Sequence, residues 1–411
     1  MNSECVRTQT ALMDVRCRGK FRSVVASPYS HSAENAVKIT DIEVISFRTK
    51  SRNHPTRYGY YYWGDEREVT TSITKIVTDE GAVGYNHGGN QDVIDRVVKP
   101  LLVGENPFDR EKLWHWMDQH PGFSEGLAGM IDCALWDLYG RFVGLPVHKC
   151  LGGCRDRVKA YASTWPNMGK PEDYAKHALE MKQLGFTAYK VHAYIYFNPR
   201  TWEPAPQLPG FPKEDVEVCR AVREAVGPDM VLMLDPFGVY TLEESIWVGR
   251  ELEKLDYYWL EHPMIETRPE AYRRLREAVD IPICSPEHAP GGPFTRAEWV
   301  LQRGSDMSRI DVHYGGITGS YKHAMLCQAY GIQCEMHGGG WTNSHILGAT
   351  PESTCEYFER GLLRPDLDYE KPAPHLKAIC DPMDDGGNVV LTDKPGLGME
   401  FDWDYIEANR V

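Results

Sequence analysis

The sequence predicts an α/β protein centred on a TIM-type barrel, and the first evidence is a regular spacing of ionisable residues. Four carboxylates and one histidine recur at intervals of 24 to 26 residues, at Asp235, Glu261, Glu287, Asp311 and His337. A strand, its covering helix and two loops take about 20–30 residues, so these intervals place each side chain on the next parallel strand. The five side chains are therefore expected to meet at one mouth of a barrel.

Short apolar runs are the second observation. They end at or just before the three central acids, at 231–234, 257–260 and 281–284. Runs of this length and composition are typical of buried parallel strands. Helical periodicity lies between them, for example at 242–255 and 270–279. Alternation of strand and helix indicates the α/β class.

From residue 158 onward the chain holds eight strand candidates. They lie at 158–163, 188–192, 231–235, 257–261, 281–284, 309–312, 333–337 and 354–359. The longest step separates the second candidate from the third, because residues 194–212 form a stretch rich in proline and aromatic side chains. A long βα loop belongs at the catalytic face of a barrel, so we expect this one to cover the site.

The residues ahead of the barrel have the pattern of a small α+β module. Strand candidates lie at 42–47, 69–78 and 82–85, and helical patterns at 93–102, 109–117 and 126–142. The predicted organisation is a flexible tail, the module, the barrel and a segment that returns to the module. The corresponding ranges are 1–37, 38–155, 156–362 and 363–411.

The composition indicates which classes of partner and which cellular compartment to expect. The 411 residues carry a formal net charge of −14, which would repel nucleic acid and anionic membranes, so neither is expected as a partner. No apolar run approaches the roughly 18 residues of a membrane helix. The 11 cysteines are an odd number scattered through apolar segments, and the first 37 residues lack an apolar signal stretch. Both features predict a reduced, cytoplasmic protein.

Three of the acids are candidates for a metal site. Asp235, Glu261 and Glu287 come from consecutive strands, and Mg²⁺ prefers oxygen ligands of this kind. Any one of them alone could be a solvated acid at a strand end. Three acids gathered in one pocket without cationic partners would be costly, and we therefore predict a Mg²⁺ site.

The next two strands bring a carboxylate beside an imidazole. Asp311 would orient His337 and raise its affinity for a proton, which makes the pair a candidate general base. Taken singly, Asp311 could be a helix cap and His337 a hydrogen-bonded core histidine. The glycines at 338–340 favour the catalytic interpretation, because they permit close approach of a ligand.

A second group of candidates lies on the other side of the metal strands. Lys190 and His192 are two residues apart on one strand candidate and therefore share a face. Lys190 is expected to stabilise a carboxylate or enolate, and His192 to act as a base opposite His337. Glu359, with Glu356 as its alternative, is expected to hydrogen-bond a substrate oxygen.

These residues resemble the motifs of the enolase superfamily and, within it, of the mandelate racemase/muconate lactonizing enzyme family. The matching segments are 131–137, 144–153, 190–192, 259–263, 287–288 and 310–318, together with Asp235 and His337. The resemblance implies a (β/α)7β barrel with an N-terminal α+β capping domain that the C-terminal segment completes. It also implies a homo-oligomer, from dimer to octamer.

The resemblance further implies a mechanism. Mg²⁺ held by Asp235, Glu261 and Glu287 would bind a substrate carboxylate, and a base would remove the proton α to it to give an enediolate. Two departures from the family pattern bear on this transfer. His192 stands where lysine is commoner, and Pro236-Phe237 follows Asp235 where many relatives have a small residue and asparagine.

Substrate selection is expected mainly in the segment 52–63, which offers cations and hydroxyl groups to a polyhydroxylated anion. Each residue taken singly could equally be a packing residue of an aromatic loop. The candidates for substrate contact are Arg52, Arg57, Tyr58, Trp63, His87, Trp165 and Trp341.

The leading hypothesis is a Mg²⁺-dependent acid-sugar dehydratase. It would remove the C2 proton of an aldonate or aldarate and expel the C3 hydroxyl, giving a 2-keto-3-deoxy acid. A racemase, epimerase or cycloisomerase is the alternative, because bases on two faces also suit deprotonation and reprotonation. Whether His192 or His337 starts the reaction stays open. A non-catalytic barrel is a more distant alternative, which the complete ligand set disfavours.

Overall fold

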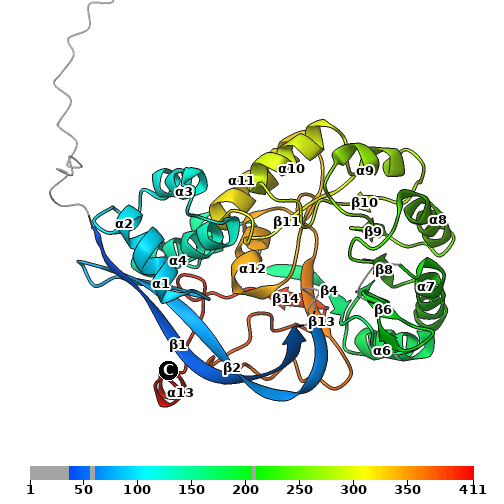
Figure 1. Cartoon of the computed structure of the whole chain (residues 1–411), viewed down its shortest axis with the longest axis horizontal. Helices are drawn as coiled ribbons and strands as arrows, with labels where there is room; N and C mark the ends of the chain where they lie inside the picture. The colour runs from blue at the N-terminus through cyan, green and yellow to red at the C-terminus, as the bar shows by residue number, and fades with distance from the viewer. Residues whose placement is uncertain (1–36, 56–60, 206–209) are drawn as a thin grey trace, which may run out of the picture. The chain divides into compact units, whose positions relative to one another are not determined.

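The computed structural model describes residues 37–55, 61–205 and 210–411, and it confirms the predicted fold class. Parallel strands form a barrel that helices surround, and an antiparallel sheet with its own helices lies beside it (Figure 1). Apart from Val37, the predicted tail falls outside these residues. The predicted domain boundaries stay a prediction.

The barrel repeats strand and helix seven times and ends on a strand. The strands are β4 (Arg157–Thr164), β5 (Ala188–Val191), β8 (Val231–Leu234), β9 (Trp259–Glu261), β10 (Ile283–Cys284), β11 (Ser308–Ile310), β12 (Cys334–Met336) and β13 (Phe358–Leu363). The helices are α6 (Pro171–Gln183), α7 (Pro212–Val226), α8 (Leu242–Glu253), α9 (Pro269–Arg276), α10 (Gly292–Leu301), α11 (Gly316–Tyr330) and α12 (Gly340–Ala349).

Backbone hydrogen bonds close these strands into one parallel barrel. Six of them pair in the order β10-β9-β8-β5-β4-β13, and β11 pairs with β12. A parallel bridge between Cys284 and Met307 joins β10 to the start of β11. The amide of Cys334 donates to the carbonyl of Thr354 at 2.6 Å, which ties β12 to the segment before β13. Side chains at the carboxyl ends of all eight strands therefore face one mouth.

The last strand corrects one prediction. The candidate at 354–359 is displaced, since β13 begins at Phe358 and runs to Leu363 in register with β4. Glu359 is therefore the second residue of the strand and not its last. The shift follows from pairing, because Phe358 lies opposite Ala160 of β4 while residues 354–357 form no ladder.

The antiparallel sheet begins with a long hairpin. It consists of β1 (Ile39–Pro55), β2 (Tyr61–Thr78) and β3 (Val83–His87), in that order. The segment predicted as a substrate loop is mostly strand, because Asn53 pairs with Trp63 and His54 with Tyr62. Strand pairing thus carries Arg52 and Trp63 toward the barrel on a stiff ribbon.

Helices of different lengths cover this sheet and connect it to the barrel. They are α1 (Gln91–Val93), η2 (Ile94–Val98), α2 (Lys99–Leu102), α3 (Arg110–Gln119), α4 (Glu125–Val143) and α5 (Val147–Cys150). The Ser124 hydroxyl caps α4 by accepting from the amide of Leu127 at 3.2 Å, and Gly144 ends the helix in the left-handed conformation at φ 73°. None of the helices in the described ranges is long and apolar enough to cross a bilayer.

A buried acid of α4 fixes the helical layer to the barrel. Both oxygens of Asp132 accept from Thr318 of α11, at 2.9 Å from the amide and 2.7 Å from the hydroxyl. The indole of Trp136 donates to the same hydroxyl at 2.9 Å. Burial raises the pKa of Asp132 to about 7, although the hydrogen bonds from Thr318 oppose this rise. The two layers therefore meet in a packed and hydrogen-bonded contact.

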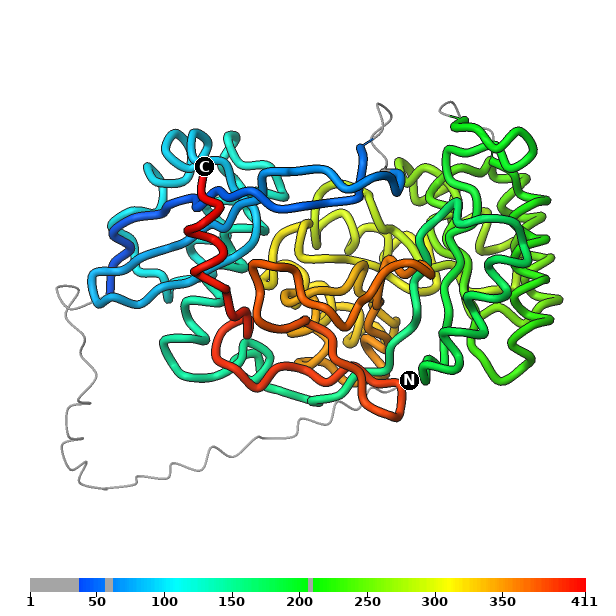
Figure 2. Tube along the Cα trace, turned by 90° about the horizontal axis from the view of Figure 1, so that it is seen from below, coloured from blue at the N-terminus to red at the C-terminus, as the bar shows by residue number. Residues whose placement is uncertain are grey.

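The end of the chain lies along the first strand, as both views show (Figures 1 and 2). Strand β14 (Asn388–Val390) pairs antiparallel with β4, and α13 (Trp403–Ala408) follows. The amide of Arg48 donates to Asn409 at 2.8 Å, and the amide of Val411 donates to Ser46 at 3.0 Å. The C-terminal segment thus contacts both the barrel and β1.

The long βα segment after β5 contains a small hairpin, β6 (Phe197–Asn198) and β7 (Glu203–Pro204).

Candidate active site

Three buried carboxylates lie at the mouth of the barrel. Asp235 follows β8, Glu261 ends β9, and Glu287 follows β10. Each has an oxygen within 4.8 Å of an oxygen of the other two, and each residue is at most 1 % exposed. Burial raises the pKa of Glu261 to about 8, although Arg309 and Lys190 lower it. An acidic group of this kind is suited to a hard divalent cation.

The charges around this group support the same conclusion. Two cations and four carboxylates are buried together, and we call these six residues the inner charge cluster: Lys190, Arg309, Asp235, Glu261, Glu287 and Glu359. Uncompensated charge inside a protein is strongly unfavourable. Lys190 and Arg309 balance two of the four carboxylates, and the imidazoles of His262 and His337 contact Glu287 from outside the cluster. The three mouth carboxylates offer the oxygen ligands that Mg²⁺ prefers, so the residues fit this ion.

Lys190 lies at the centre of the cluster. Its ammonium is 3.1 Å from both oxygens of Glu261, 2.8 Å from Glu359 Oε1 and 3.5 Å from Asp235 Oδ2. Burial lowers its pKa, but the Glu261 and Glu359 carboxylates outweigh burial and hold the pKa well above its ordinary value. Lys190 is therefore a permanent positive charge at the floor of the site.

His192 is held on the same face of the chain by hydrogen bonds at both ring nitrogens. Nδ1 lies 2.7 Å from the carbonyl oxygen of Thr164, and since a carbonyl can only accept, Nδ1 carries a proton. Nε2 lies 2.9 Å from Asp235 Oδ2. The Thr164 contact thus leaves Nε2 as the nitrogen directed at the acidic group.

The predicted dyad is assembled on the opposite side. His337 Nδ1 lies 2.5 Å from Asp311 Oδ2, and Nε2 lies 2.7 Å from Glu287 Oε1. Burial lowers the pKa of His337, but Glu287 and Asp311 outweigh it and raise that pKa well above its ordinary value. The His337 side chain is 30 % exposed, so a ligand in the mouth can reach it. Asp311 fixes the ring with Nε2 toward the metal group.

Glu359 lies below the mouth, inside the barrel, because it is the second residue of β13 and not the last. It is 5 % exposed and contacts Lys190, Arg309, the Ser163 hydroxyl and the amide of Gly338. Its alternative, Glu356, precedes β13 at the amino end of the barrel and accepts from the hydroxyl of Tyr258 at 2.7 Å. Of the two glutamates, only Glu359 belongs to the inner charge cluster.

Three residues of the site carried no predicted role. Arg309 is fully buried in β11, and His262 and His288 directly follow two of the mouth carboxylates. His262 Nδ1 is 3.0 Å from Glu287 Oε2, and His288 Nε2 is 3.2 Å from Glu287 Oε1. Burial lowers the pKa of His262, but Glu266 and Glu287 raise it to about 9. Arg309 precedes Asp311 by two positions, so strand periodicity could have placed it in the barrel.

Three of the predicted substrate residues meet at the barrel mouth. The Trp63 and Trp165 rings make an edge contact with centroids 5.8 Å apart, and the Arg52 guanidinium lies 5.3 Å from the Trp63 ring. The Trp63 indole donates to Asp366 Oδ2 at 3.2 Å. Trp165 follows β4, and its amide donates to Leu363 at the end of β13. The hairpin end therefore reaches the rim of the barrel.

The other predicted substrate residues lie elsewhere. His87 packs against His375 and Phe401 of the C-terminal segment, with ring centroids 5.6 and 6.0 Å away, and burial lowers its pKa to about 4. Trp341 of α12 lines a cavity of about 630 Å³. Arg57 and Tyr58 lie outside the described residues.

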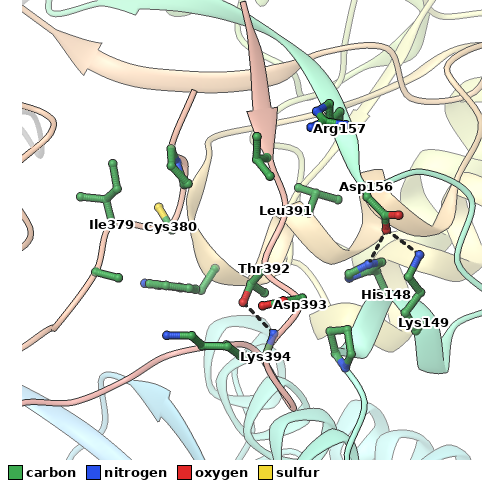
Figure 3. Close-up of a pocket in the computed structure, with 16 residues that line it drawn as sticks. His148, Lys149, Asp156, Arg157, Ile379, Cys380, Leu391, Thr392, Asp393 and Lys394 are labelled. Atoms are coloured by element: carbon green, nitrogen blue, oxygen red, sulfur yellow. Dashed lines mark hydrogen bonds and ion pairs between the residues drawn. The ribbon is translucent and has the colours of Figure 1, made fainter. Parts of the chain in front are cut away.

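The cavity beside Trp341 is on the flank of the barrel, near the amino end of β4. Asp156 bonds to His148 and Lys149 on one side, and Ile379 and Cys380 come from the C-terminal segment on the other (Figure 3). The catalytic candidates lie at the carboxyl ends of the strands. This cavity is thus separate from the barrel mouth.

The fold and the site together define a barrel enzyme with an acidic group at its mouth that could hold a divalent metal. Residues 173–405 match the model of the enolase C-terminal domain-like family. Residues 41–152 match the N-terminal domain of mandelate racemase/muconate lactonizing enzymes. The chain belongs to this family of the enolase superfamily.

Individual relatives within the superfamily differ in their reactions. The chain is 30 % identical to an arabinonate dehydratase of Saccharolobus solfataricus, over 81 % of this chain and 88 % of that one. It is 27 % identical to a D-galactarolactone cycloisomerase of Agrobacterium fabrum, over 82 % and 91 %. Its fold matches the crystal structure of a D-glucarate dehydratase from Agrobacterium tumefaciens complexed with magnesium. That match has a TM-score of 0.85 and 38 % identity, and it covers 91 % of this chain and 99 % of the other.

Proposed function

We propose that the protein is a Mg²⁺-dependent acid-sugar dehydratase that converts an aldonate or aldarate to a 2-keto-3-deoxy acid and water. The observation that carries the proposal is the His337–Asp311 dyad, whose Nε2 lies 2.7 Å from a mouth carboxylate. A base at that position can reach the α-carbon of a carboxylate bound beside Glu287. The similarity to arabinonate and D-glucarate dehydratases supports the substrate class.

The chain's own residues account for the first step. Asp235, Glu261 and Glu287 would hold Mg²⁺, which when bound would neutralise and polarise the substrate carboxylate. Glu287 raises the pKa of His337, and Mg²⁺ held by Glu287 would offset that carboxylate's charge, so that His337 can be neutral at Nε2. His337 then accepts the C2 proton at Nε2, while Asp311 stabilises the imidazolium that forms. The positive charge of Lys190 stabilises the negative charge that develops on the carboxylate oxygens.

The second step expels the C3 hydroxyl. An imidazolium donates a proton to this leaving group, so that water departs as the C2–C3 double bond forms. The proton comes from His337, which has just gained one, or from His192 on the opposite face. The enol product tautomerises to the 2-keto-3-deoxy acid. The two steps move one proton and one hydroxide, and their sum is the loss of water.

A racemase, epimerase or cycloisomerase is the second candidate. The observation that favours it is the pair of imidazoles on opposite walls, His192 beside Asp235 and His337 beside Glu287. A base on each face can remove a proton from one side and return it from the other. The similarity to a D-galactarolactone cycloisomerase supports the same alternative.

A homo-oligomeric state and a cytoplasmic location also stay predictions.

The test is incubation of the purified protein and Mg²⁺ with a panel of aldonates and aldarates in D₂O. A dehydratase yields a 2-keto-3-deoxy acid, detected by semicarbazide and by NMR. Exchange of the C2 proton for deuterium without keto acid would reject dehydration and support the isomerase. Absence of both exchange and product across the panel would reject acid sugars as substrates.

A further inference from the structure

A fully buried arginine connects two parts of the site. Arg309 Nε lies 2.5 Å from Glu261 Oε1, and Nη2 lies 2.6 Å from Glu359 Oε2. Nη2 also donates to the Tyr161 hydroxyl at 3.1 Å, and Nη1 donates to the Met336 carbonyl at 3.3 Å. The guanidinium is 0 % exposed and lies below the mouth, so it contacts protein groups on every side. The guanidinium therefore lies between the two glutamates and forms an ion pair with each of them.

Glu359 has partners at each of its acceptor positions. Oε1 faces Lys190 Nζ and Ser163 Oγ, each at 2.8 Å, and Oε2 faces Arg309 Nη2 and the amide of Gly338, each at 2.6 Å. Burial raises its pKa, but Lys190 and Arg309 outweigh burial and hold the pKa well below its ordinary value. An ionised carboxylate cannot donate a hydrogen bond. Glu359 is therefore occupied with protein groups and cannot donate to a substrate oxygen.

These contacts form a continuous path between the metal ligand Glu261 and the turn that follows His337. Glu261 is one of the mouth carboxylates, and Arg309 forms ion pairs with Glu261 through Nε and with Glu359 through Nη2. Glu359 in turn holds the amide of Gly338, the residue directly after His337. Gly338 has φ 71°, a conformation suited to glycine, and this turn determines where the His337 ring enters the mouth.

We propose that Arg309 and Glu359 are positioning residues that couple the metal ligand Glu261 to the turn carrying His337. The inference rests on the proposed metal site and base, and it assigns to Glu359 a role other than contact with substrate. Mg²⁺ held by Glu261 would restrain that carboxylate, and the Arg309–Glu359 pair would transmit the restraint to Gly338. The base would then be ordered before a substrate arrives.

Two measurements on the whole protein test the coupling without a substrate. The first is Mg²⁺ affinity by calorimetry, comparing wild type with Arg309→Lys and Glu359→Gln. Groups that orient metal ligands typically contribute about 10–100-fold in affinity, so we expect losses of that size. The second is hydrogen exchange of the segment 337–340. Mg²⁺ should slow exchange at Gly338 in wild type and leave it unchanged in both variants.

A matched control separates positioning from stability. Arg223 also spreads its guanidinium over protein groups, donating to the carbonyls of Leu255, Gly227, Met230 and Asp256, but it lies at the amino end of the barrel. Arg223→Lys should lower the melting temperature and leave both Mg²⁺ readouts as in wild type. If Arg309→Lys does not fold, Tyr161→Phe removes one hydroxyl contact and should weaken Mg²⁺ binding by about 3- to 10-fold.

The proposal is overturned by any of three results. These are a Mg²⁺ affinity within twofold of wild type in the folded variants, a Gly338 exchange rate that still responds to Mg²⁺ in them, or a wild type that binds no Mg²⁺. The readouts are distinct from those for the function. A wild type that couples Mg²⁺ to Gly338 but dehydrates no acid sugar would reject the function and keep the coupling. A wild type that dehydrates an acid sugar but shows no effect of Mg²⁺ on Gly338 would reject the coupling and keep the function.

Discussion

The inner charge cluster and the hairpin end differ in how their charges are held. In the cluster, Lys190, Arg309 and Glu261 are fully buried, and each contacts at least two groups of opposite charge or polarity. At the hairpin end, which comprises residues 52–55 and 61–64, Arg52 lies 3.9 Å from Asp366 with both side chains more than 40 % exposed. Charges interact strongly when buried and weakly when solvated. The comparison predicts that substitutions in the cluster affect the proposed reaction strongly, whereas substitutions at the hairpin end cost little stability.

The largest effect is expected from the base in the buried region. His337→Asn keeps a hydrogen-bonding group near Asp311 but removes the proton acceptor at Nε2. We expect kcat on any acid sugar that is turned over to fall by about 10²–10⁴-fold. Steady-state kinetics on the keto-acid product check this. His115→Gln, an exposed histidine beside Glu111, is the control and should leave kcat unchanged. Retention of kcat within tenfold would remove His337 from the mechanism.

Metal removal tests whether Mg²⁺ bound to the mouth carboxylates stabilises the folded protein. Mg²⁺ at 100 times its dissociation constant should stabilise the fold by about 2.7 kcal/mol, because it binds the native state alone. Thermal melts with EDTA and with increasing Mg²⁺ measure this stabilisation. Glu261→Gln removes one charged ligand and should reduce the shift. A melting temperature that is independent of Mg²⁺ in the wild type would mean that the mouth carboxylates bind no divalent cation.

Asp215 is a buried acid that forms no ion pair with any described residue, and it provides the contrast to Glu359. Asp215 accepts from the Tyr240 hydroxyl at 2.5 Å and from the amide of Tyr194 at 3.1 Å. Burial raises its pKa to about 7 from 3.8. Between these values the unfolded chain ionises and the native state keeps the proton, so its stabilising contribution is complete below pH 3.8 and is lost as pH rises toward 7.

Asp215→Asn should therefore remove part of this pH dependence. From pH 5 to pH 6 the free energy of unfolding of wild type should fall relative to the variant by about 1.4 kcal/mol. Urea unfolding at the two pH values measures the difference. Parallel changes in the two proteins would show that Asp215 titrates as an ordinary acid.

The smallest effect is expected at the hairpin end. Asp366→Asn removes the carboxylate that faces Arg52 and the Trp63 indole. An exposed pair of this kind contributes about 0.2–1 kcal/mol, so the melting temperature should change little. If the hairpin end selects substrate, KM should change by a few fold while kcat stays constant. A loss of kcat comparable to that of His337→Asn would contradict the division between the two regions.

Much of the site was accessible to sequence reasoning because it depends on strand periodicity. The spacing of Asp235, Glu261 and Glu287 placed them at one mouth, where the structure gathers their oxygens within 4.8 Å. The same periodicity predicted the contact between Asp311 and His337. Residues that do not stand at the end of a barrel strand were harder to place. His87 and Trp341 were expected near the substrate, but His87 packs on the C-terminal segment and Trp341 lines a flank cavity.

The sequence by itself determined the barrel class and the placement of the three acids, Asp311 and His337 at its mouth. These features follow from local patterns, since a strand and its helix repeat along the chain wherever apolar and polar residues alternate correctly. Only the tertiary structure decided that Arg309 bridges Glu261 and Glu359, and that Glu359 meets Lys190 from the strand on the other side of β4. Such pairings join residues 48 to 169 positions apart, and their geometry depends on how the closed barrel directs each side chain into a shared interior. No local pattern encodes that geometry.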